Sequence, residues 1–163
     1  MDIWMVEAIS EARAGLAEGG QPVGAVLVKS GAILGRGRNR LYQSGDPTTH
    51  AEMEAYRDAA VRAGGKQNPE GADSHLATCT VYTTATPCEM CAGTIIRFAA
   101  TCVIIGEATT YPASGTIELM RRQGIQVVVL ETTDCIRLVE QYFQRYPERQ
   151  LQWTTPRSPA LRL

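Results

Sequence analysis

The chain has 163 residues, of which 44% are hydrophobic and 20% charged, and its formal net charge is −1. This length suits one domain with one core. The charge does not favour a protein whose main partner is a nucleic acid, since such proteins hold phosphates with an excess of basic residues. The sequence holds no apolar run of 18 or more residues, so we expect no membrane-spanning helix.

Helical and strand patterns alternate along the chain. Apolar residues at helical spacing between Trp4 and Leu16 predict a first helix that ends at Gly19. Short apolar or β-branched runs predict strands over Val23–Val28, Ala32–Arg38, Thr80–Thr84, Val103–Ile105 and Ile125–Leu130. Further helices are predicted over His50–Ala63, Cys88–Ala99, Ala113–Gly124 and Thr133–Tyr146. Loops are predicted over Asn39–Thr49 and 64–78.

This order of elements predicts an α/β fold, with helices packed on both faces of one central sheet. The later strand–helix–strand units are expected to be parallel, because such crossovers are right-handed. The sequence contains no internal repeat or linker that would divide it. We therefore expect a single domain over 1–163, in which 147–163 is a C-terminal tail or lid.

The five cysteines are odd in number, and no basic, apolar secretory signal opens the chain. We therefore expect a reduced, cytoplasmic setting in which some thiols bind metal. Cys88 and Cys91 are separated by two residues at a predicted helix start, so their sulfurs point to one side and suit a single tetrahedral zinc. His50, at another helix start, would complete a set of three ligands.

Three protein ligands leave the fourth position of zinc open for water, as catalytic zinc requires. Zinc lowers the pKa of such a water to about 7, which makes hydroxide available as a nucleophile. Glu52 stands two residues from His50, near enough to exchange protons with that water. It would pass a proton to a ring nitrogen and later to the leaving ammonia. His-x-Glu followed by Pro-Cys-x-x-Cys is the signature of zinc base deaminases.

Other interpretations of these residues remain open. Cys88 and Cys91 also have the spacing of a redox pair, and His50 alone would be read as a core histidine. A structural zinc would need a fourth ligand from Cys79, Cys102, Cys135 or His75. We interpret these other three cysteines as small buried hydrophobic residues, and His75 as solvated.

These residues resemble the cytidine deaminase-like zinc superfamily from the first helix to about Tyr146. Within it, Val81–Ile96, Cys102–Glu107 and Gly35–Asn39 are most similar to fungal-type cytosine deaminases, which act on the free base. The resemblance implies a three-layer α/β/α sandwich with a central mixed five-stranded sheet. It also implies a homodimer with one zinc ion per subunit.

The resemblance further implies residues that bind the substrate. Asn39 matches an asparagine that binds the base carbonyl, helped by the backbone N–H of Ala51. Tyr111 falls where an aromatic residue stacks on the ring, and Trp153 would close the pocket. Without a substrate role, Asn39 would be a turn residue that bonds its own backbone, and Tyr111 would cover the edge of the core.

Two departures from the cytosine deaminases bear on the substrate. Their tail carries an aspartate that contacts the amino group of cytosine, whereas Glu148–Thr155 contains none. Asp46–Glu52 looks more like the guanine and tRNA adenosine deaminases. We expect hydrolytic deamination of a free aminated heterocycle, with cytosine first, or alternatively guanine or a small ring such as creatinine.

Two further functions are alternatives to this expectation. A tRNA adenosine deaminase would need more basic residues than the two lysines, Lys29 and Lys66, readily supply. A scaffold protein with a structural zinc would show four protein ligands and no water on the metal.

Overall fold

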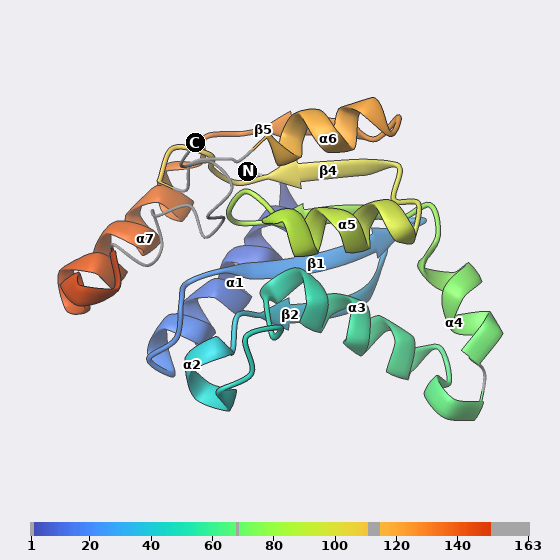
Figure 1. The fold of residues 1–163 in the computed structure, drawn as a ribbon, viewed down its shortest axis with the longest axis horizontal. Coiled ribbons are helices and arrows are strands. Elements are labelled where there is room, and N and C mark those ends of the chain that lie inside the picture. Colours follow the sequence, from blue (N-terminus) through green and yellow to red (C-terminus); the bar gives the residue numbers. More distant parts are fainter. Residues whose placement is uncertain (1, 68, 111–114, 151–163) are drawn as a thin grey trace, which may run out of the picture.

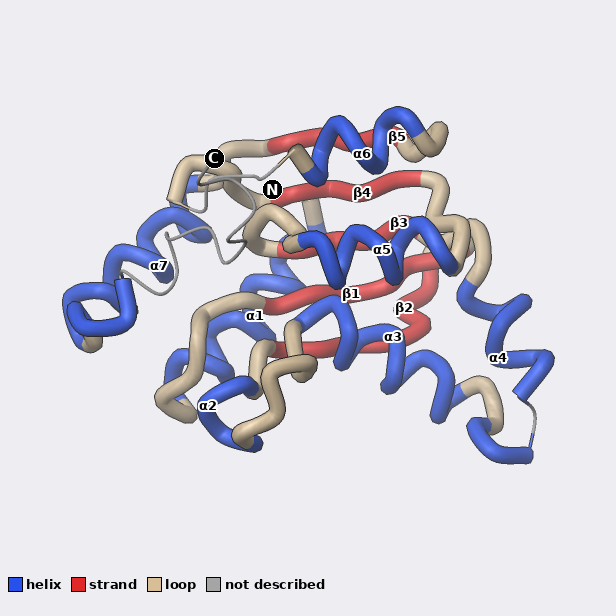
Figure 2. The backbone as a smooth tube through the Cα atoms, in the orientation of Figure 1, coloured by secondary structure: helices blue, strands red, loops and turns tan. Residues whose placement is uncertain are grey.

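The computed structural model describes residues 2–67, 69–110 and 115–150. Five strands form one mixed sheet in the order β2-β1-β3-β4-β5 (Figures 1 and 2). The antiparallel pairs are β1–β2 and β1–β3, and the parallel pairs are β3–β4 and β4–β5. The strands are β1 Gly24–Lys29, β2 Ala32–Arg38, β3 Thr80–Thr83, β4 Cys102–Ile105 and β5 Gln126–Val129. The mixed five-stranded sheet that the resemblance implies is confirmed.

The turn between β1 and β2 follows from two residues with left-handed backbones. Ser30 and Gly31 have φ angles of 51° and 74°, and Lys29 pairs directly with Ala32. A two-residue loop with both φ angles positive has the twist that antiparallel neighbours require. This tight hairpin sets the pairing next to the turn, and an irregularity between Leu27 and Val28 shifts the register for the rest of β2, whose last residue leads into Asn39.

Helices cover both faces of the sheet and complete a three-layer α/β/α sandwich. In Figure 1, α3, α5 and α6 lie in front of the sheet and α1 lies behind it. Side chains of α1 and α7 share one apolar cluster with Val26 and Val28 of β1, whereas Ala25 and Leu27 belong to the other cluster. The helix bounds are α1 Ile3–Ala17, α3 Ala51–Arg62, α5 Glu89–Arg97, α6 Thr116–Arg122 and α7 Thr133–Arg145.

Two predicted loops contain short helices. A four-residue helix, α2 Leu41–Ser44, lies within the predicted loop Asn39–Thr49. The predicted loop 64–78 contains a 3-10 turn over Gly65–Gln67 and α4 Pro69–Leu76. Tertiary contacts explain α4, because Leu76 is buried and the ammonium of Lys29 lies 2.7 Å from the carbonyl oxygen of Ala77. A cation at a helix C-terminus stabilises it.

The structure describes only part of two predicted segments, the start of α6 and the C-terminal tail. Helix α6 begins at Thr116, whereas the prediction began at Ala113, and 111–114 lie outside the described residues. Of the predicted tail 147–163, the structure describes a 3-10 turn over Pro147–Arg149 and then Gln150. Within the described part of the chain, every helix is too short or too polar to cross a bilayer.

Candidate metal centre and active site

The start of α3 is held close against the edge strand β2. A Cβ atom built on Gly37 would lie 2.2 Å from the carbonyl oxygen of Ala51, and one on Gly35 would lie 2.3 Å from that of Ala55. Only glycine permits so close an approach of helix and strand. The N–H of Arg40 also donates to the carbonyl of Thr49, at 2.9 Å. These contacts fix the backbone on both sides of His50, which directly precedes α3.

His50, Cys88 and Cys91 lie together, as the sequence predicts, where α3 and α5 begin. The Nδ1 atom of His50 lies 3.5 Å from the Cys88 sulfur and 3.6 Å from the Cys91 sulfur. Zinc–sulfur and zinc–nitrogen bonds of ordinary length at tetrahedral angles place sulfur and nitrogen ligands about 3.5 Å apart. The three donor atoms therefore fit one tetrahedral zinc ion.

The cluster contains three candidate ligands among the described residues, with all donor atoms within 4.8 Å of one another. Cys79, Cys102, Cys135 and His75 are described but are not members of it. Cys79 lies 3.9 Å from the Tyr56 hydroxyl, and Cys135 belongs to the apolar cluster on the opposite face of the sheet. A set of three ligands favours a catalytic centre over a closed structural one.

The two thiols of the cluster have opposite pKa shifts. The pKa of Cys88 is lowered to about 4, chiefly by a hydrogen bond from Cys91 and further by His50, against the effect of burial. The pKa of Cys91 is raised, because its thiol donates to the Cys88 sulfur and because it is buried. Cys88 is therefore already a thiolate at neutral pH, which is the form that binds metal.

Glu52 is buried beside the cluster, with a side chain that is 3% exposed. Its Oε1 atom accepts a hydrogen bond of 2.9 Å from the Thr83 hydroxyl. Burial raises the pKa of Glu52, and the nearby Cys88 thiolate raises it further. Glu52 does not belong to the candidate ligand group, so its carboxylate can exchange protons without binding metal.

The structure describes two of the four residues predicted to bind the substrate. Asn39 is 2% exposed; its Oδ1 accepts from the Leu41 N–H at 3.1 Å and its Nδ2 donates to Gln21 at 3.0 Å. The bond to Leu41 is the turn interaction expected of Asn39 without a substrate role. Ala51 is fully buried in the first turn of α3, which no side chain caps. Tyr111 and Trp153 lie outside the described residues.

Sequence reasoning missed two buried polar residues at the carboxyl ends of strands, Thr83 and Glu107. Thr83 is fully buried at the end of β3. Glu107, also fully buried, accepts hydrogen bonds of 2.8 Å from the N–H groups of Thr109 and Thr110. Thr83 ends β3 and Glu107 lies two residues after β4, so both are at the carboxyl ends of parallel strands, where α/β proteins place their sites. A polar residue at that position was the signal available in the sequence.

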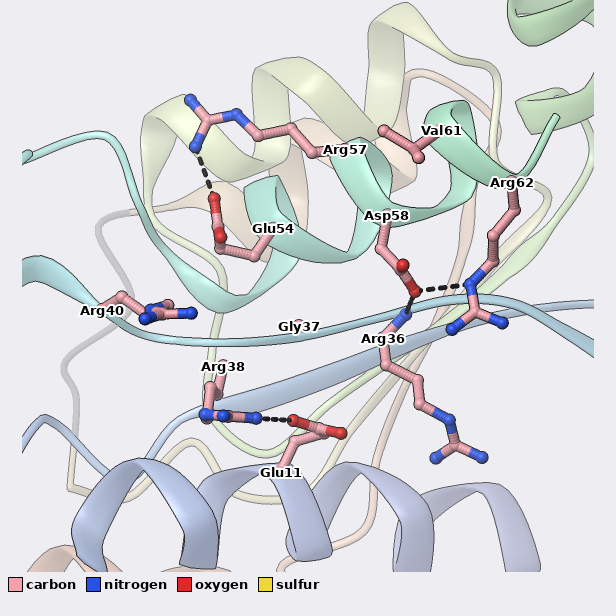
Figure 3. Close-up of a pocket in the computed structure, with 10 residues that line it drawn as sticks. All are labelled: Glu11, Arg36, Gly37, Arg38, Arg40, Glu54, Arg57, Asp58, Val61 and Arg62. Atoms are coloured by element: carbon pink, nitrogen blue, oxygen red, sulfur yellow. Dashed lines mark hydrogen bonds and ion pairs between the residues drawn. The ribbon is translucent and has the colours of Figure 1, made fainter. Parts of the chain in front are cut away.

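A separate groove of about 410 Å³ runs along the exposed edge of β2, between α1 and α3 (Figure 3). Its arginines are largely paired with carboxylates: Arg38 with Glu11, and Arg57 with Glu54. Asp58 accepts from the backbone N–H of Arg36 at the strand edge. These charged side chains protect the edge strand β2 from pairing with a strand of another chain. Because the arginines are largely neutralised by carboxylates, the groove does not form a concentrated phosphate-binding site.

The chain is similar in sequence to known proteins. The family model of the cytidine and deoxycytidylate deaminase zinc-binding region matches residues 2–107. A cytosine deaminase of Candida albicans is 32% identical over 142 residues, which cover 86% of this chain and 87% of that protein. A guanine deaminase of Bacillus subtilis is 45% identical over 76 residues, or 47% and 44% of the two chains.

Enzymes that act on RNA are also similar. A tRNA-specific adenosine deaminase of Streptococcus pyogenes is 32% identical over 154 residues, which cover 90% of this chain and 91% of that protein. A solved structure from a study of tRNA:A34 deaminases has a TM-score of 0.70 at 24% identity, covering 83% of this chain and 98% of that one. The latter shows the shared fold. This chain therefore belongs to the cytidine and deoxycytidylate deaminase family and is a zinc-dependent hydrolase of C–N bonds.

Proposed function

We propose that this chain hydrolyses the exocyclic amino group of a free aminated heterocycle, with cytosine as the first substrate. The reaction consumes one water and converts cytosine to uracil and ammonia. The observation that supports it most is the placement of a buried, non-ligating carboxylate, Glu52, beside a three-residue zinc site. The similarity to a cytosine deaminase over 86% of this chain supports the pyrimidine ring as the first to test.

In this proposal His50, Cys88 and Cys91 hold the metal. Zinc, when bound, supplies a Lewis acid that lowers the pKa of a water molecule to about 7. Glu52 would accept a proton from the attacking water and give it to the ring nitrogen beside the reacting carbon. It would then take a second proton from the hydroxyl group added to that carbon and give it to the amino group as the C–N bond breaks and the carbonyl forms. Burial of Glu52 favours these proton transfers, because it raises the pKa of the carboxyl group toward neutral pH, where a group both accepts and donates protons readily.

Asn39 and the N–H of Ala51 would bind the carbonyl of the base. The two hydrogen bonds of Asn39, from Leu41 and to Gln21, hold its amide in one orientation before a ligand arrives. The amide has two N–H donors, and Gln21 accepts from one of them. We propose that the other donates to the substrate. Tyr111 and Trp153 remain proposed as the stacking and closing residues.

The charge of the β2 groove supports a small substrate. Several arginines of the β2 groove are held by carboxylates, as Figure 3 shows for Arg38, Arg57 and Arg62. Neutralised arginines contribute little to phosphate binding. Because the tRNA adenosine deaminases match this chain over nearly its full length, an anticodon stem-loop belongs in the substrate test.

Guanine is the second candidate substrate. The guanine deaminase of B. subtilis has the highest identity among the three relatives described above, although over less than half of each chain. The tail segment Glu148–Thr155 also lacks the aspartate expected to contact cytosine. A buried polar contact of this kind can change specificity by orders of magnitude.

The test is ammonia release by the zinc-loaded protein from a panel of substrates: cytosine, 5-methylcytosine, isocytosine, guanine, adenine, creatinine, cytidine and a tRNA anticodon stem-loop. Faster turnover of cytosine than of the others supports the proposal. Turnover of guanine or creatinine with cytosine inert would assign the same chemistry to another ring. Turnover of the stem-loop alone would refute a free-base substrate.

The role of Glu52 has its own test. We expect Glu52→Ala to lower kcat by at least about 100-fold while zinc content stays at one per chain. Glu54→Ala is the matched control, because Glu54 lies on the same helix and pairs with Arg57 at the surface. Equal turnover by Glu52→Ala and the wild type would refute the proton-transfer role.

A further inference from the structure

Thr83 is the last residue of β3, the central strand of the sheet, and its side chain is fully buried. Its hydroxyl lies 2.9 Å from Oε1 of Glu52 and 3.2 Å from the carbonyl oxygen of Ala85. A threonine hydroxyl has one proton to donate. The carboxylate is the nearer acceptor, and hydrogen bonds to an ionised group are the stronger ones. The proton therefore goes to Glu52.

The sheet does not need this hydroxyl. The backbone of Thr83 pairs with Ala25 of β1 and Ile105 of β4, and its carbonyl accepts from the Gly106 N–H at 2.8 Å. The neighbouring Thr84 supports the strand end in a different way, since its hydroxyl oxygen accepts from the Gly24 N–H at 3.1 Å. Of these two buried threonines, Thr83 is the one that contacts Glu52.

The Thr83 hydroxyl keeps its proton whether or not zinc is bound, because an alcohol does not ionise near neutral pH. Thr83 is thus a side-chain donor to Glu52 that persists when the metal site is filled.

We propose that Thr83 is a positioning residue for the deamination reaction: its hydroxyl holds the Glu52 carboxylate in the orientation from which it transfers protons. The inference rests on the proposed function, because it assigns to Glu52 the proton transfers described there. Without the hydroxyl, the carboxylate samples other rotamers and reaches the reacting atoms less often. The loss falls on kcat, since Thr83 makes no proposed contact with the substrate.

The experiment compares the zinc-loaded wild type with Thr83→Val, Thr83→Ala and Thr83→Ser. Valine has the shape of threonine without the hydroxyl, alanine is a second hydroxyl-free variant, and serine restores the donor. We expect Thr83→Val and Thr83→Ala to lower kcat by about 10- to 100-fold, with KM and zinc content within twofold of the wild type. Thr83→Ser should recover most of the loss.

Thr84→Val is the matched control, because it removes an equally buried hydroxyl one residue away that does not touch Glu52. It should lower the thermal midpoint but leave kcat near the wild-type value. Loss of kcat in Thr84→Val equal to that in Thr83→Val would overturn the proposal, as would a loss expressed in KM alone. Wild-type kcat in Thr83→Val would overturn it while leaving the proposed function intact.

Crystal structures test the positioning role of Thr83 separately from the proposed function. In crystal structures of the zinc-loaded proteins, Glu52 should occupy one rotamer in the wild type and a different or divided set in Thr83→Val. Silence of the wild type across the substrate panel would refute the proposed function, and the rotamer comparison would still test the contact. An unchanged Glu52 rotamer in Thr83→Val would refute the positioning role directly.

Discussion

Gly37 of β2 lies directly against Ala51, the first residue of α3, so closely that a Cβ atom on Gly37 would stand 2.2 Å from the Ala51 carbonyl oxygen. His50 and Glu52 flank Ala51. The distance between the edge strand and the helix therefore sets the position of one candidate zinc ligand and of the proposed proton carrier. A glycine in the middle of a strand is unfavourable by itself, and this contact is its physical explanation.

Gly37→Ala should displace the start of α3. Because the obstructing atom belongs to the helix backbone, we expect a loss of about 1–3 kcal/mol in the free energy of unfolding together with weaker zinc retention. Denaturant titration and zinc measurement after dialysis would check both. Gly93→Ala is the control: its Cβ meets nothing within 4 Å in the middle of α5, so it should be neutral or stabilising. Equal effects from both variants would contradict this account.

The local part of the site could be predicted from the sequence, and the part that depends on sheet order could not. Cys88 and Cys91 are three positions apart at the start of one helix, so their spacing alone brings their sulfurs together. The contact between Thr83 and Glu52 joins residues 31 positions apart. It forms only because β3 lies beside the strands against which α3 packs. No local pattern contains that information.

The same distinction explains the helices that were missed. Four residues, Leu41–Ser44, are too few for a helical period to show in sequence. Helix α4 depends on burial of Leu76 and on Lys29, which is 48 residues from Ala77. By contrast, the long helix predicted after Thr133 is observed over Thr133–Arg145 because its apolar and polar faces alternate with a clear period.

Metal removal should expose Cys88 to alkylation. Because the pKa of Cys88 is lowered to about 4 in the metal-free protein, the thiolate persists well below the pH at which an ordinary cysteine is protonated, near 8.5. We expect iodoacetamide to label Cys88 of the chelator-treated protein at pH 6, ahead of the other four cysteines. Peptide mass spectrometry would identify the site.

Zinc should suppress that labelling, since the bound thiolate is not available. Acidification should release the metal, because protons compete with zinc for the sulfurs and for the His50 imidazole. The thermal midpoint should therefore fall on chelation and recover when zinc is added back. Equal labelling of Cys88 with and without zinc would argue against its role as a ligand.

Glu107 should stabilise the loop that follows β4. Its carboxylate accepts from the N–H groups of Thr109 and Thr110 at 2.8 Å and from the Thr110 hydroxyl at 2.5 Å. Glu107→Gln replaces one acceptor oxygen by an amide group that cannot accept, so a part-buried donor loses its charged partner. We expect a loss of about 1–3 kcal/mol in the free energy of unfolding. Glu118→Gln, at an exposed site on α6, should change it by less than about 0.5 kcal/mol.

Arg149 fastens the last described turn of the chain to the loop that carries Asn39. Its guanidinium lies 3.9 Å from the ring centroid of Tyr42 on α2 and 4.0 Å from that of Tyr146. It also donates to the carbonyl oxygen of Gly19 at 3.0 Å. Contacts of a guanidinium with two aromatic faces contribute about 0.5–2 kcal/mol each.

Arg149→Ala should therefore lower the free energy of unfolding by about 1–2 kcal/mol and raise KM more than it lowers kcat. The KM effect follows from α2, whose Leu41 N–H bonds the Asn39 side chain; when α2 loosens, the amide proposed to bind the substrate loses its fixed orientation. Steady-state kinetics and denaturant titration would measure both quantities.

Arg97→Ala is the control for Arg149→Ala. Arg97 also pairs with an aromatic ring, that of Phe98 at 5.3 Å, and with Asp73 at 3.4 Å, but it lies at the far end of α5 from Cys88. Its removal should change stability slightly and leave KM unaltered. A rise in KM of similar size in both variants would indicate a general loss of rigidity, and the specific link from Arg149 through α2 to Asn39 would have to be abandoned.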